Sequence, residues 1–418
     1  MMRVALRVLP ALGCIALLLA GCGGRPEDTL LPVAAGAPGG ATVDLLVATT
    51  RAPDANPARM YTGERDQTFN FADIKMAIPP DGARTIGEVQ WPSQPPNLAR
   101  EFVVLKAQRL DEKDALRAFH DRLTRTSHRR VLVFVHGYNT RFGEAVFRLA
   151  QIAHDSKIDA LPVLFTWPSR GRLLAYTYDR ESANYSRDAL EKVLQGLARD
   201  PAVREIAVLA HSMGNLVTLE ALRQMAIRNG AIAPKIKSVM LAAPDVDVDV
   251  FRRQIIEMGA KRPPFTLFVA QNDEALAISS RIWGGTPRIG MIDPKQEPYR
   301  TMLAQQHINV LDLTDIKSGD SLGHTKFAES PQIVQLIGTR LASGQTLGDG
   351  HSGLGDRLAQ ITTGAAATVG TAAGVALSAP IAIVDGRTRD NLDEQLRELG
   401  TQVQDTAGST GRVVGTRY

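Results

Sequence analysis

Cysteine is almost absent from the sequence: its 418 residues include two, Cys14 and Cys22. A framework of disulfides is therefore excluded, and so is a metal site built on several thiolates. The chain is nevertheless long enough to bury a large core without crosslinks, either as one large domain with appendages or as two domains.

An excess of charge of one sign is also missing. Lysine and arginine number 48 and aspartate and glutamate 44, which gives a formal net charge of +4 at pH 7. Aromatic residues make up 5% of the chain and do not alternate with basic residues, so no nucleic-acid partner is expected. Neither a cluster of metal ligands nor a glycine-rich phosphate loop stands out, so no metal and no cofactor are expected.

The first 22 residues have the pattern of an export signal. Arg3 and Arg7 precede an apolar run over 8–20, and small residues ending at Cys22 follow it. The run is shorter than a helix that crosses the bilayer requires. The quartet Leu-Ala-Gly-Cys at 19–22 resembles the bacterial lipobox, and this resemblance implies cleavage before Cys22 and lipidation of it. A plain signal peptide or a retained membrane anchor is the alternative.

Changes in composition along the chain predict four parts. These are a lipoprotein signal peptide over 1–21, a flexible tether over 22–42, a folded domain over 43–343 and a Gly/Ala-rich tail over 344–418. The expected location is the cell envelope, with a lipid anchor and the domain facing the periplasm. Gly23 after the cysteine resembles outer-membrane lipoproteins, which favours the outer over the inner membrane.

The tail carries two patterns. An uncharged stretch over 358–384 is rich in Ala, Gly and Thr, but its low hydropathy and Pro380 argue against a membrane span. A short amphipathic pattern follows over 392–403. Both are interpreted as elements that pack on the domain or lie on a membrane surface, with a span as the alternative for the first.

Within the folded part, short apolar runs alternate with helical patterns. Because the apolar runs are continuous and separated by helices, they predict parallel strands buried on both faces. The expected architecture is a doubly wound, mostly parallel sheet with helices on both faces, and its ligands collect at the carboxyl ends of the strands. The predicted strands cover 43–48, 71–78, 101–107, 130–135, 161–166, 205–210, 238–242, 265–270 and 309–313, and the predicted helices cover 111–123, 142–154, 182–197, 215–226 and 325–341.

One predicted strand ends in Ala-His-Ser-Met-Gly at 210–214 and leads straight into a predicted helix. A serine on such a turn projects its hydroxyl above the sheet and needs small neighbours two residues away, which Ala210 and Gly214 provide. The start of the helix offers N–H groups and a positive dipole to a developing oxyanion. This placement predicts that Ser212 is a nucleophile, with a helix-capping serine as the alternative.

A serine hydroxyl needs a base and an orienting carboxylate to become reactive. In folds with this turn, the acid and then the histidine follow the serine in the chain. Among the eight histidines, His324 lies in the loop after the last strand and is the predicted base, with a surface-loop histidine as the alternative. His307 precedes the final strand at its far end, and His351 lies in the tail.

Three aspartates follow late strands and compete for the acid. Asp273 comes at the carboxyl edge of strand 265–270 and is the first choice. Asp245 and Asp247 follow the preceding strand and are the alternative. A third interpretation is that all three cap turns and helices, which would leave the tautomer of the histidine unfixed.

The oxyanion hole and the substrate pocket are expected near the same edge. The motif Val-His-Gly-Tyr-Asn at 135–139 ends an earlier strand, and the predicted donors are the backbone N–H groups of Tyr138 and Met213. His136 is interpreted as a packing and loop-fixing residue rather than a second base. Leu173 and Leu174, in a loop that leaves the same edge, either form part of the acyl or alcohol pocket or belong to a solvated loop.

These motifs resemble a bacterial α/β-hydrolase family catalogued as a domain of unknown function and labelled esterase/lipase-like. The resemblance spans residue 43 to about residue 341, and it implies the α/β-hydrolase fold and a Ser-Asp-His triad at Ser212, Asp273 and His324. It names no substrate, and Thr-Lys-Phe at 325–327 departs from the Ser-Tyr-Phe usual in relatives. The segments that carry it are 48–51, 135–139, 165–169, 210–214, 242–247, 272–276, 288–290 and 323–324.

The sequence therefore predicts a serine hydrolase that cleaves a small-molecule or lipid carboxylic ester through an acyl-enzyme. Amide or thioester hydrolysis, or acyl transfer at the same site, is one alternative. A non-catalytic envelope lipoprotein that keeps the fold is another. The N-terminal lipid would bind a membrane, and no protein partner is predicted.

Overall fold

The structure, a computed structural model, describes residues 26–34, 40–317 and 319–342 of the chain. The predicted signal peptide, the lipidation site Cys22 and the tail over 344–418 lie outside the described residues. None of the helices in the described part combines the length and the hydropathy that crossing a bilayer requires.

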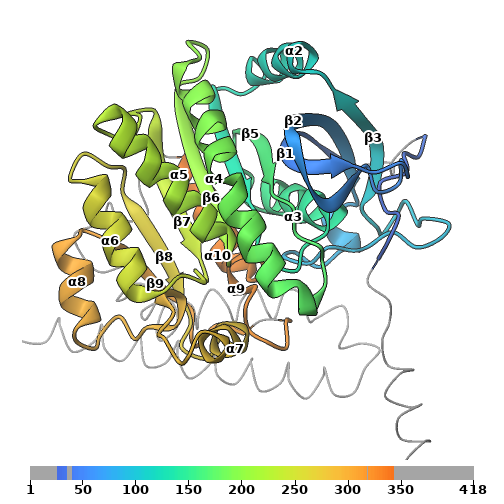
Figure 1. The fold of residues 1–418 in the computed structure, drawn as a ribbon. Coiled ribbons are helices and arrows are strands. Elements are labelled where there is room, and N and C mark those ends of the chain that lie inside the picture. The colour runs from blue at the N-terminus through green and yellow to red at the C-terminus, as the bar shows by residue number, and fades with distance from the viewer. Residues whose placement is uncertain (1–25, 35–39, 318, 343–418) are drawn as a thin grey trace, which may run out of the picture. The chain divides into compact units, whose positions relative to one another are not determined.

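A nine-stranded sheet forms the centre of the domain, in the order β3-β2-β1-β5-β4-β6-β7-β8-β9 (Figure 1). The first three strands pair antiparallel, and every pair from β1–β5 to β8–β9 is parallel. The predicted mostly parallel sheet is therefore confirmed. Its strands are β1 (Ala41–Pro53), β2 (Tyr61–Ile78), β3 (Val103–Leu110), β4 (Arg130–Val135), β5 (Leu161–Thr166), β6 (Glu205–His211), β7 (Ile236–Ala242), β8 (Phe265–Val269) and β9 (Asn309–Asp312).

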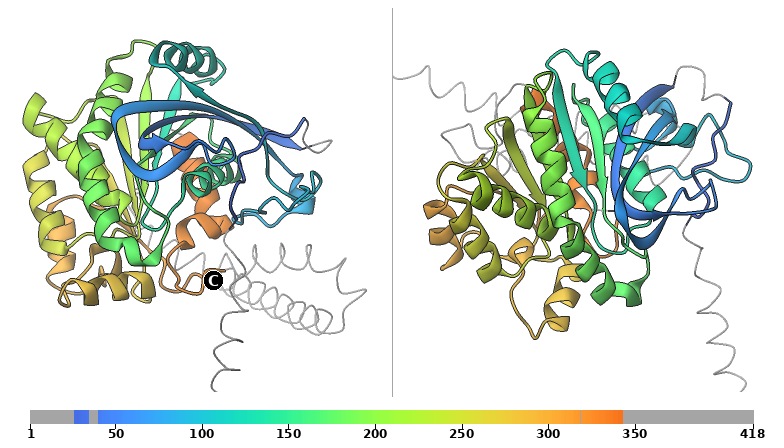
Figure 2. Two further views of the ribbon diagram at one scale, coloured as in Figure 1. Left: turned by 45° about the vertical axis from the view of Figure 1, so that its right-hand side comes forward. Right: turned by 45° about the horizontal axis from the view of Figure 1, so that its top comes forward.

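Helices cover both faces of the sheet. Figures 1 and 2 show α4, α5 and α6 side by side over one face, and α3 and α10 over the other. All residues of β5 and β8 are buried, as expected for parallel strands covered on both faces. The helices are α2 (Glu112–Leu123), α3 (Phe142–Asp155), α4 (Tyr176–Arg199), α5 (Gly214–Asn229), α6 (Val248–Met258), α7 (Glu274–Ile282), α8 (Tyr299–Gln305), α9 (Lys326–Glu329) and α10 (Pro331–Ala342), with 3₁₀ turns η1 (Asp81–Ala83), η2 (Leu173–Ala175) and η3 (Ile289–Met291).

Two parts of the fold were not expected from the sequence. The first half of β2 is largely exposed and carries polar residues, so it has no apolar run that would mark a strand. The helices α6, α7 and α8 are short. α6 buries one face at helical spacing, with Phe251, Ile255 and Met258, whereas α7 buries two residues and α8 one residue. Asp247 and Asp273 start the first two of these helices as N-caps.

Part of the segment expected to be a flexible tether packs against the domain. Leu30 is fully buried, and its N–H donates to the carbonyl of Ala58 at 3.0 Å. The N–H of Val33 donates to the carbonyl of Val104 at 2.8 Å. Burial of the Leu30 side chain stabilises this contact, so residues 26–34 pack on the surface of the domain and do not form a flexible tether.

Candidate active site

Ser212 lies between the end of β6 and the start of α5 and has a backbone φ of +53°. A non-glycine residue keeps this strained conformation only where its surroundings hold it. Here the N–H of Ser212 donates to the carbonyl of Ala242 at 2.9 Å, and the side-chain amide of Asn215 donates to the same carbonyl at 3.0 Å. Met213, one of the two predicted oxyanion donors, follows as the N-cap of α5 and is fully buried.

Two glycines allow the loop after β4 to lie directly against this turn. A Cβ atom on Gly214 would lie 2.3 Å from the carbonyl oxygen of His136, and one on Gly137 would lie 2.8 Å from Cβ of Ser212. A side chain at either position would push the loop away from the serine. Tyr138, the second predicted oxyanion donor, therefore follows directly after a residue that touches Ser212.

Asp273 and His324, which are far apart in the sequence, are joined by a hydrogen bond of 2.7 Å between Oδ2 and Nδ1. The other carboxylate oxygen of Asp273 accepts the N–H of Leu276 at 2.9 Å and so caps α7. Burial lowers the pKa of His324, but the charge of Asp273 and its hydrogen bond outweigh this, and the net effect raises the pKa. Because the Nδ1 proton is held by the carboxylate, Nε2 is the nitrogen that would act as the base.

His211 connects the loop of His324 to the turn of Ser212. Its Nε2 donates to the carbonyl of His324 at 3.1 Å, and the two rings lie 4.8 Å apart. Burial and the charge of His324 hold the pKa of His211 well below 6.5, so it is neutral and serves as a donor. The described residues show no hydrogen bond from the Ser212 hydroxyl to the ring of His324, and in sites without substrate this contact is often longer than a hydrogen bond. Sequence reasoning did not identify His211, because its role depends on a contact with a distant loop.

The loop that carries His324 is fixed at both ends. The carboxylate of Asp320 accepts the N–H of His324 at 2.8 Å. Two residues after His324, Lys326 donates to Oδ1 of Asn272 at 2.7 Å and to two backbone carbonyls that follow β9. This lysine belongs to the Thr-Lys-Phe departure from the family pattern, and it ties the histidine loop to the residue before Asp273.

The two alternative acids have other partners. Asp247 caps α6 through two backbone N–H groups. Asp245 accepts hydrogen bonds from Tyr176 at 2.8 Å and from Ser279 at 2.5 Å, and it lies 3.5 Å from Nε of the buried Arg288. Among the described residues, Asp273 alone of the three candidates is hydrogen-bonded to the ring of His324.

His136 has the surroundings of a structural residue. Its Nδ1 donates to the carbonyl of Gly137 at 2.8 Å, its Nε2 accepts the N–H of Trp167 at 3.2 Å, and its ring stacks on the indole of Trp167. Burial, together with the nearby charge of Arg51, lowers the pKa of His136 to about 3. The ring is therefore neutral and already bonded on both nitrogens, which is what fixing the loop requires.

Arg51 is an almost fully buried arginine, 1% exposed, whose guanidinium binds backbone carbonyls around the loop of Tyr138. It donates to the carbonyls of Thr140 and Ser169, both at 2.8 Å, to the carbonyl of Thr62 at 3.0 Å and to the hydroxyl of Thr166 at 2.8 Å. Burial lowers the pKa of Arg51 to about 10, so it stays charged at neutral pH. The sequence motif around residue 51 marked the family, but its role depends on backbone carbonyls from distant segments.

Asp179, at the start of α4, binds the loop of Tyr138 as an acceptor and joins it to the neighbouring loop after β5. Its carboxylate accepts the N–H of Asn139 at 3.2 Å, the N–H of Arg170 at 2.9 Å and the hydroxyl of Ser169 at 2.5 Å. Burial raises the pKa of Asp179, and these hydrogen bonds oppose the rise. Arg51 and Asp179 therefore position the loop that would carry one oxyanion donor.

Arg51→Met is expected to lower the free energy of unfolding by about 3 kcal/mol, because it leaves several buried carbonyls without donors. Urea unfolding followed by circular dichroism measures this change. Arg172→Met removes an exposed arginine from the same region and is the matched control, with an expected change within about 0.5 kcal/mol. Equal stability of the two variants would contradict the role assigned to Arg51.

The loop expected to overhang the site is present, but its leucines do not line a closed pocket. Leu173 is 74% exposed and Leu174 is 101% exposed, so both side chains face solvent. Figure 1 shows the start of α4, which follows them, close to α7 at the lower edge of the domain. The indole N–H of Trp283, at the end of α7, donates to the hydroxyl of Tyr176 at 3.0 Å.

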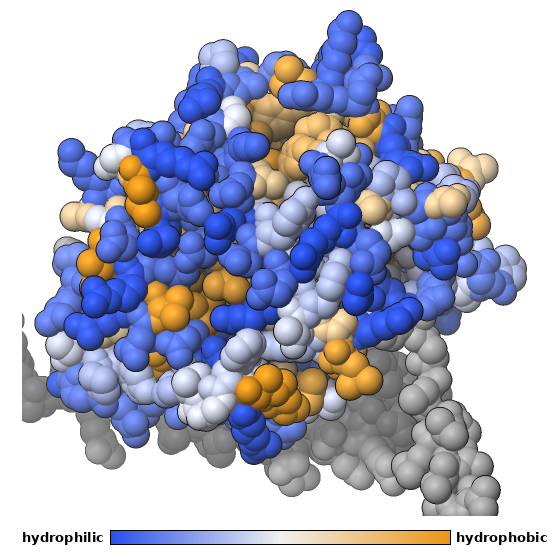
Figure 3. All heavy atoms as spheres, in the orientation of Figure 1, coloured by the Kyte–Doolittle hydropathy of each residue, from blue (hydrophilic) through white to orange (hydrophobic). Residues whose placement is uncertain are grey.

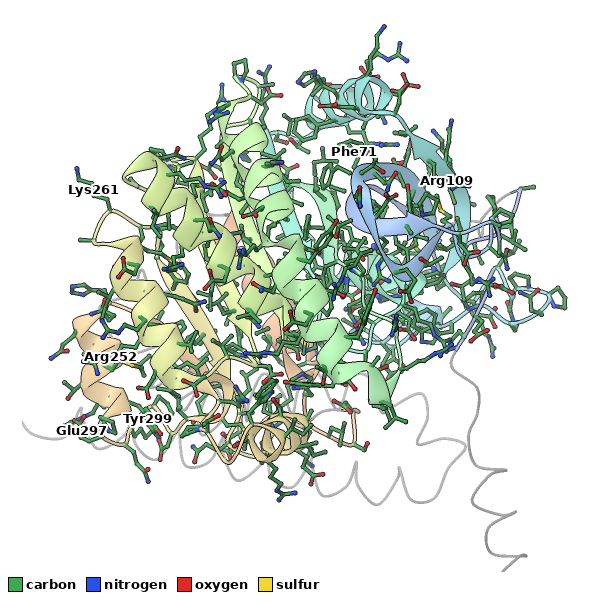
Figure 4. All side chains as sticks on the ribbon, viewed as in Figure 1. Phe71, Arg109, Arg252, Lys261, Glu297 and Tyr299 are labelled. Atoms are coloured by element: carbon green, nitrogen blue, oxygen red, sulfur yellow. The ribbon has the colours of Figure 1, made fainter. Side chains whose placement is uncertain are left out.

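A large hollow lies elsewhere in the domain. It has a volume of about 840 Å³ and is lined by residues of β1, β2, α2 and α4, none of which is a predicted site residue. Figure 3 shows apolar side chains in this region below α2, and Figure 4 labels Phe71, one of the lining residues, on β2. Ser212, Asp273 and His324 are therefore not among the residues that line this hollow.

The sheet order and the strained turn at Ser212 define the class of this protein as an α/β hydrolase. The chain belongs to the family described as alpha/beta hydrolase of unknown function (DUF900), whose model matches residues 111–340, more than half of the chain. This match confirms the predicted fold class and, over residues 111–340, the predicted resemblance to an α/β-hydrolase family of unknown function.

Several solved structures have a similar fold. A lipase-esterase related protein from Clostridium acetobutylicum has 9% identity and a TM-score of 0.30, covering 52% of this chain and 95% of its own. An esterase from Pyrococcus furiosus has 11% identity and a TM-score of 0.32, covering 77% of this chain and 98% of its own. Lipase B from Aspergillus fumigatus has 15% identity and a TM-score of 0.30, covering 51% of this chain and 52% of its own. At such low values these likenesses carry no argument about activity, and no curated protein matches the chain.

Proposed function

We propose that this protein is a serine hydrolase that cleaves carboxylic esters, with Ser212 as nucleophile, His324 as base and Asp273 as acid. The observation that carries the proposal is the 2.7 Å hydrogen bond between Asp273 and His324, on a loop that His211 ties to the turn of Ser212. A carboxylate that orients a histidine next to a strained serine is the arrangement that activates a hydroxyl.

In the proposed reaction, Nε2 of His324 takes the proton of Ser212 as Oγ attacks the carbonyl carbon of the ester. The resulting oxyanion is stabilised by the backbone N–H groups of Tyr138 and Met213, which lie on the two segments that touch at the turn. His324 then returns the proton to the leaving alcohol, which leaves an acyl group on Ser212. Water activated by the same nitrogen hydrolyses this acyl-enzyme.

A fluorophosphonate probe tests the proposal on the purified full chain. We expect one covalent adduct, located on the peptide that contains Ser212 by mass spectrometry, together with hydrolysis of short p-nitrophenyl esters. Parallel assays with a thioester and an anilide of the same acyl group separate an esterase from the thioester and amide alternatives. A protein that neither reacts with the probe nor hydrolyses any of these substrates would support the non-catalytic alternative.

The pH dependence of the reaction is a separate prediction. His324 acts as a base only when neutral, and its pKa is raised above the ordinary value of 6.5 by Asp273. The value of kcat/KM is therefore expected to be low in acid and to rise with pH through an apparent pKa above 6.5. Asp273→Asn removes the charge that raises the pKa, so the rise should move to lower pH. A profile that keeps its midpoint in this variant would contradict the pairing of Asp273 with His324.

We infer in addition that the chain is exported and lipidated on Cys22, and that it acts in the cell envelope facing the periplasm. The lipobox-like quartet at 19–22 supports this proposal. Metabolic labelling with an alkyne fatty acid, compared between the wild type and Cys22→Ser, tests it. Labelling that persists in the variant would exclude Cys22 as the modified residue.

A further inference from the structure

Exposed apolar side chains gather on segments that adjoin the proposed active site. Of the twelve large hydrophobic residues found exposed in the described part of the chain, half lie on three neighbouring segments: the turn η2, the helix α7 and the histidine loop. Isolated exposed leucines are common on protein surfaces, but a contiguous set is characteristic of an interaction surface. We call this set the apolar rim: Leu173 (74% exposed), Leu174 (101%), Ile278 (48%), Ile282 (56%), Trp283 (36%) and Leu322 (38%).

The α7 region contacts the other two segments of the apolar rim. The hydroxyl of Tyr176, which follows η2, is hydrogen-bonded to Trp283 at 3.0 Å and to Ser279 at 2.9 Å, and both partners belong to the α7 region. The N–H of Glu274, at the start of α7, donates to the carbonyl of Leu322 at 3.0 Å. Figure 3 shows apolar side chains over α7 and over the start of α4 at the lower edge of the same face.

The rim also borders the residues of the proposed chemistry. Leu322 lies two residues before His324, and the hydroxyl of Tyr138 donates to the carbonyl of Leu173. The rings of Tyr138 and Tyr176 lie 5.0 Å apart. A surface that meets the rim would therefore lie next to the loops of Tyr138 and His324.

Basic side chains lie next to the apolar rim. Arg172 and Arg281 are exposed beside the leucines and isoleucines, and the guanidinium of Arg180 lies 4.5 Å above the ring of Trp283. Glu274 is the exposed acid on α7. Tryptophan and arginine next to exposed leucine and isoleucine are the combination that favours the boundary between the headgroups and the acyl chains of a lipid layer.

The described N-terminal end of the chain lies next to this face. Pro26, Glu27 and the loop at Arg170 and Arg172 line one small hollow of about 220 Å³. Cys22 lies four residues before Pro26, so a lipid attached to Cys22 would begin within about 14 Å of that point. An anchor at Cys22 would therefore hold the rim close to the same lipid layer.

We propose that the apolar rim rests on an anionic phospholipid surface and presents the Ser212 site to esters held in that surface. The acyl chains meet the leucine and isoleucine side chains, and the lipid phosphates meet Arg172 and Arg281. The substrate class, a lipid-borne ester, rests on the proposed function, whereas binding of the rim to the surface does not.

Quenching of Trp283 by brominated phospholipids tests this binding in the full chain. The chain has three tryptophans, of which Trp167 is fully buried, so Trp91→Phe leaves Trp283 as the exposed reporter. Its fluorescence is measured in vesicles of phosphatidylglycerol and phosphatidylcholine with bromine on the acyl chains. We expect strong quenching of Trp283, and we expect that the double substitution Leu173→Ser and Leu174→Ser removes most of it. Bromine quenches tryptophan only at short range, so attachment through the N-terminus without contact between the rim and the acyl chains would leave Trp283 unquenched.

Leu116→Ser is the matched control, because Leu116 is 52% exposed on α2, which contributes no residue to the apolar rim. Ser212→Ala should be quenched like the wild type, so failure of the proposed chemistry and failure of this inference are distinguishable. Absence of quenching, or an equal loss in Leu116→Ser, would overturn the inference. So would a dimer in solution that dissociates when Leu173 and Leu174 are replaced, because the rim would then be occupied by a second copy of the chain.

Discussion

Ser212→Ala is expected to lower kcat/KM for p-nitrophenyl esters by at least about 10⁴-fold and to abolish labelling by a fluorophosphonate. The substitution removes Oγ, the atom that would form the acyl-enzyme, and leaves the rest of the site unchanged. Alanine keeps the same backbone and Cβ atom at the positive φ of this turn, so the fold should be retained. Initial rates and probe labelling measure the two effects on the same preparation.

Ser127→Ala is the control for Ser212→Ala, because Ser127 is an exposed serine that lies outside the proposed site. It should keep wild-type rates and labelling. A Ser212→Ala protein that retains more than about 1% of the wild-type rate would contradict the assignment of the nucleophile, since removing a nucleophile lowers the rate by several orders of magnitude. If Ser212→Ala unfolds at the same temperature as the wild type, its loss of activity is due to the missing hydroxyl and not to unfolding.

Asp273→Asn is expected to lower kcat/KM by about 10³- to 10⁴-fold while the protein stays folded. An asparagine oxygen can still accept the N–H of Leu276 and cap α7, so the change in stability should be below about 1 kcal/mol. What is lost is the carboxylate that holds the Nδ1 proton of His324, and with it the tautomer that makes Nε2 basic. Steady-state kinetics and urea unfolding separate the two effects.

Asp247→Asn makes the same chemical change at another helix cap that does not contact His324, so its rates should remain near wild type. Asp245→Asn addresses the alternative acid, and its effect should be smaller than that of Asp273→Asn. A deep loss in Asp245→Asn combined with a mild one in Asp273→Asn would reverse the assignment of the acid.

Much of the architecture could be predicted because its signals are local. The strands β4 to β8 read as continuous apolar runs, and parallel strands covered by helices on both faces need apolar residues on both sides. The turn at Ser212 could be recognised because a positive φ next to a close approach between backbones selects small residues at fixed spacing. The first half of β2 carries polar residues and no apolar run, and α7 and α8 bury too few residues to leave a periodic pattern. α6 buries Phe251, Ile255 and Met258 at helical spacing, but it is short.

The residues of the candidate site also fall into two groups, those that local sequence patterns predict and those that only the structure shows. Ser212, Asp273 and His324 were proposed from their places after strands and in a loop, because the carboxyl ends of parallel strands meet at one edge. His211, Arg51 and Asp179 act through backbone carbonyls, backbone N–H groups or rings of segments far away in the chain. No local pattern encodes such contacts, so their roles were visible only after folding.

The amino-acid sequence alone determined the fold class, the strand-to-helix turn at Ser212 and the order of the candidate triad along the chain, because each follows from periodicity or from the spacing of residues around strand ends. The tertiary structure decided which aspartate is hydrogen-bonded to His324, which groups hold the loop of Tyr138 and which apolar side chains remain exposed near the candidate site. These outcomes depend on hydrogen bonds and burial between distant segments, and such contacts form only when the elements pack together.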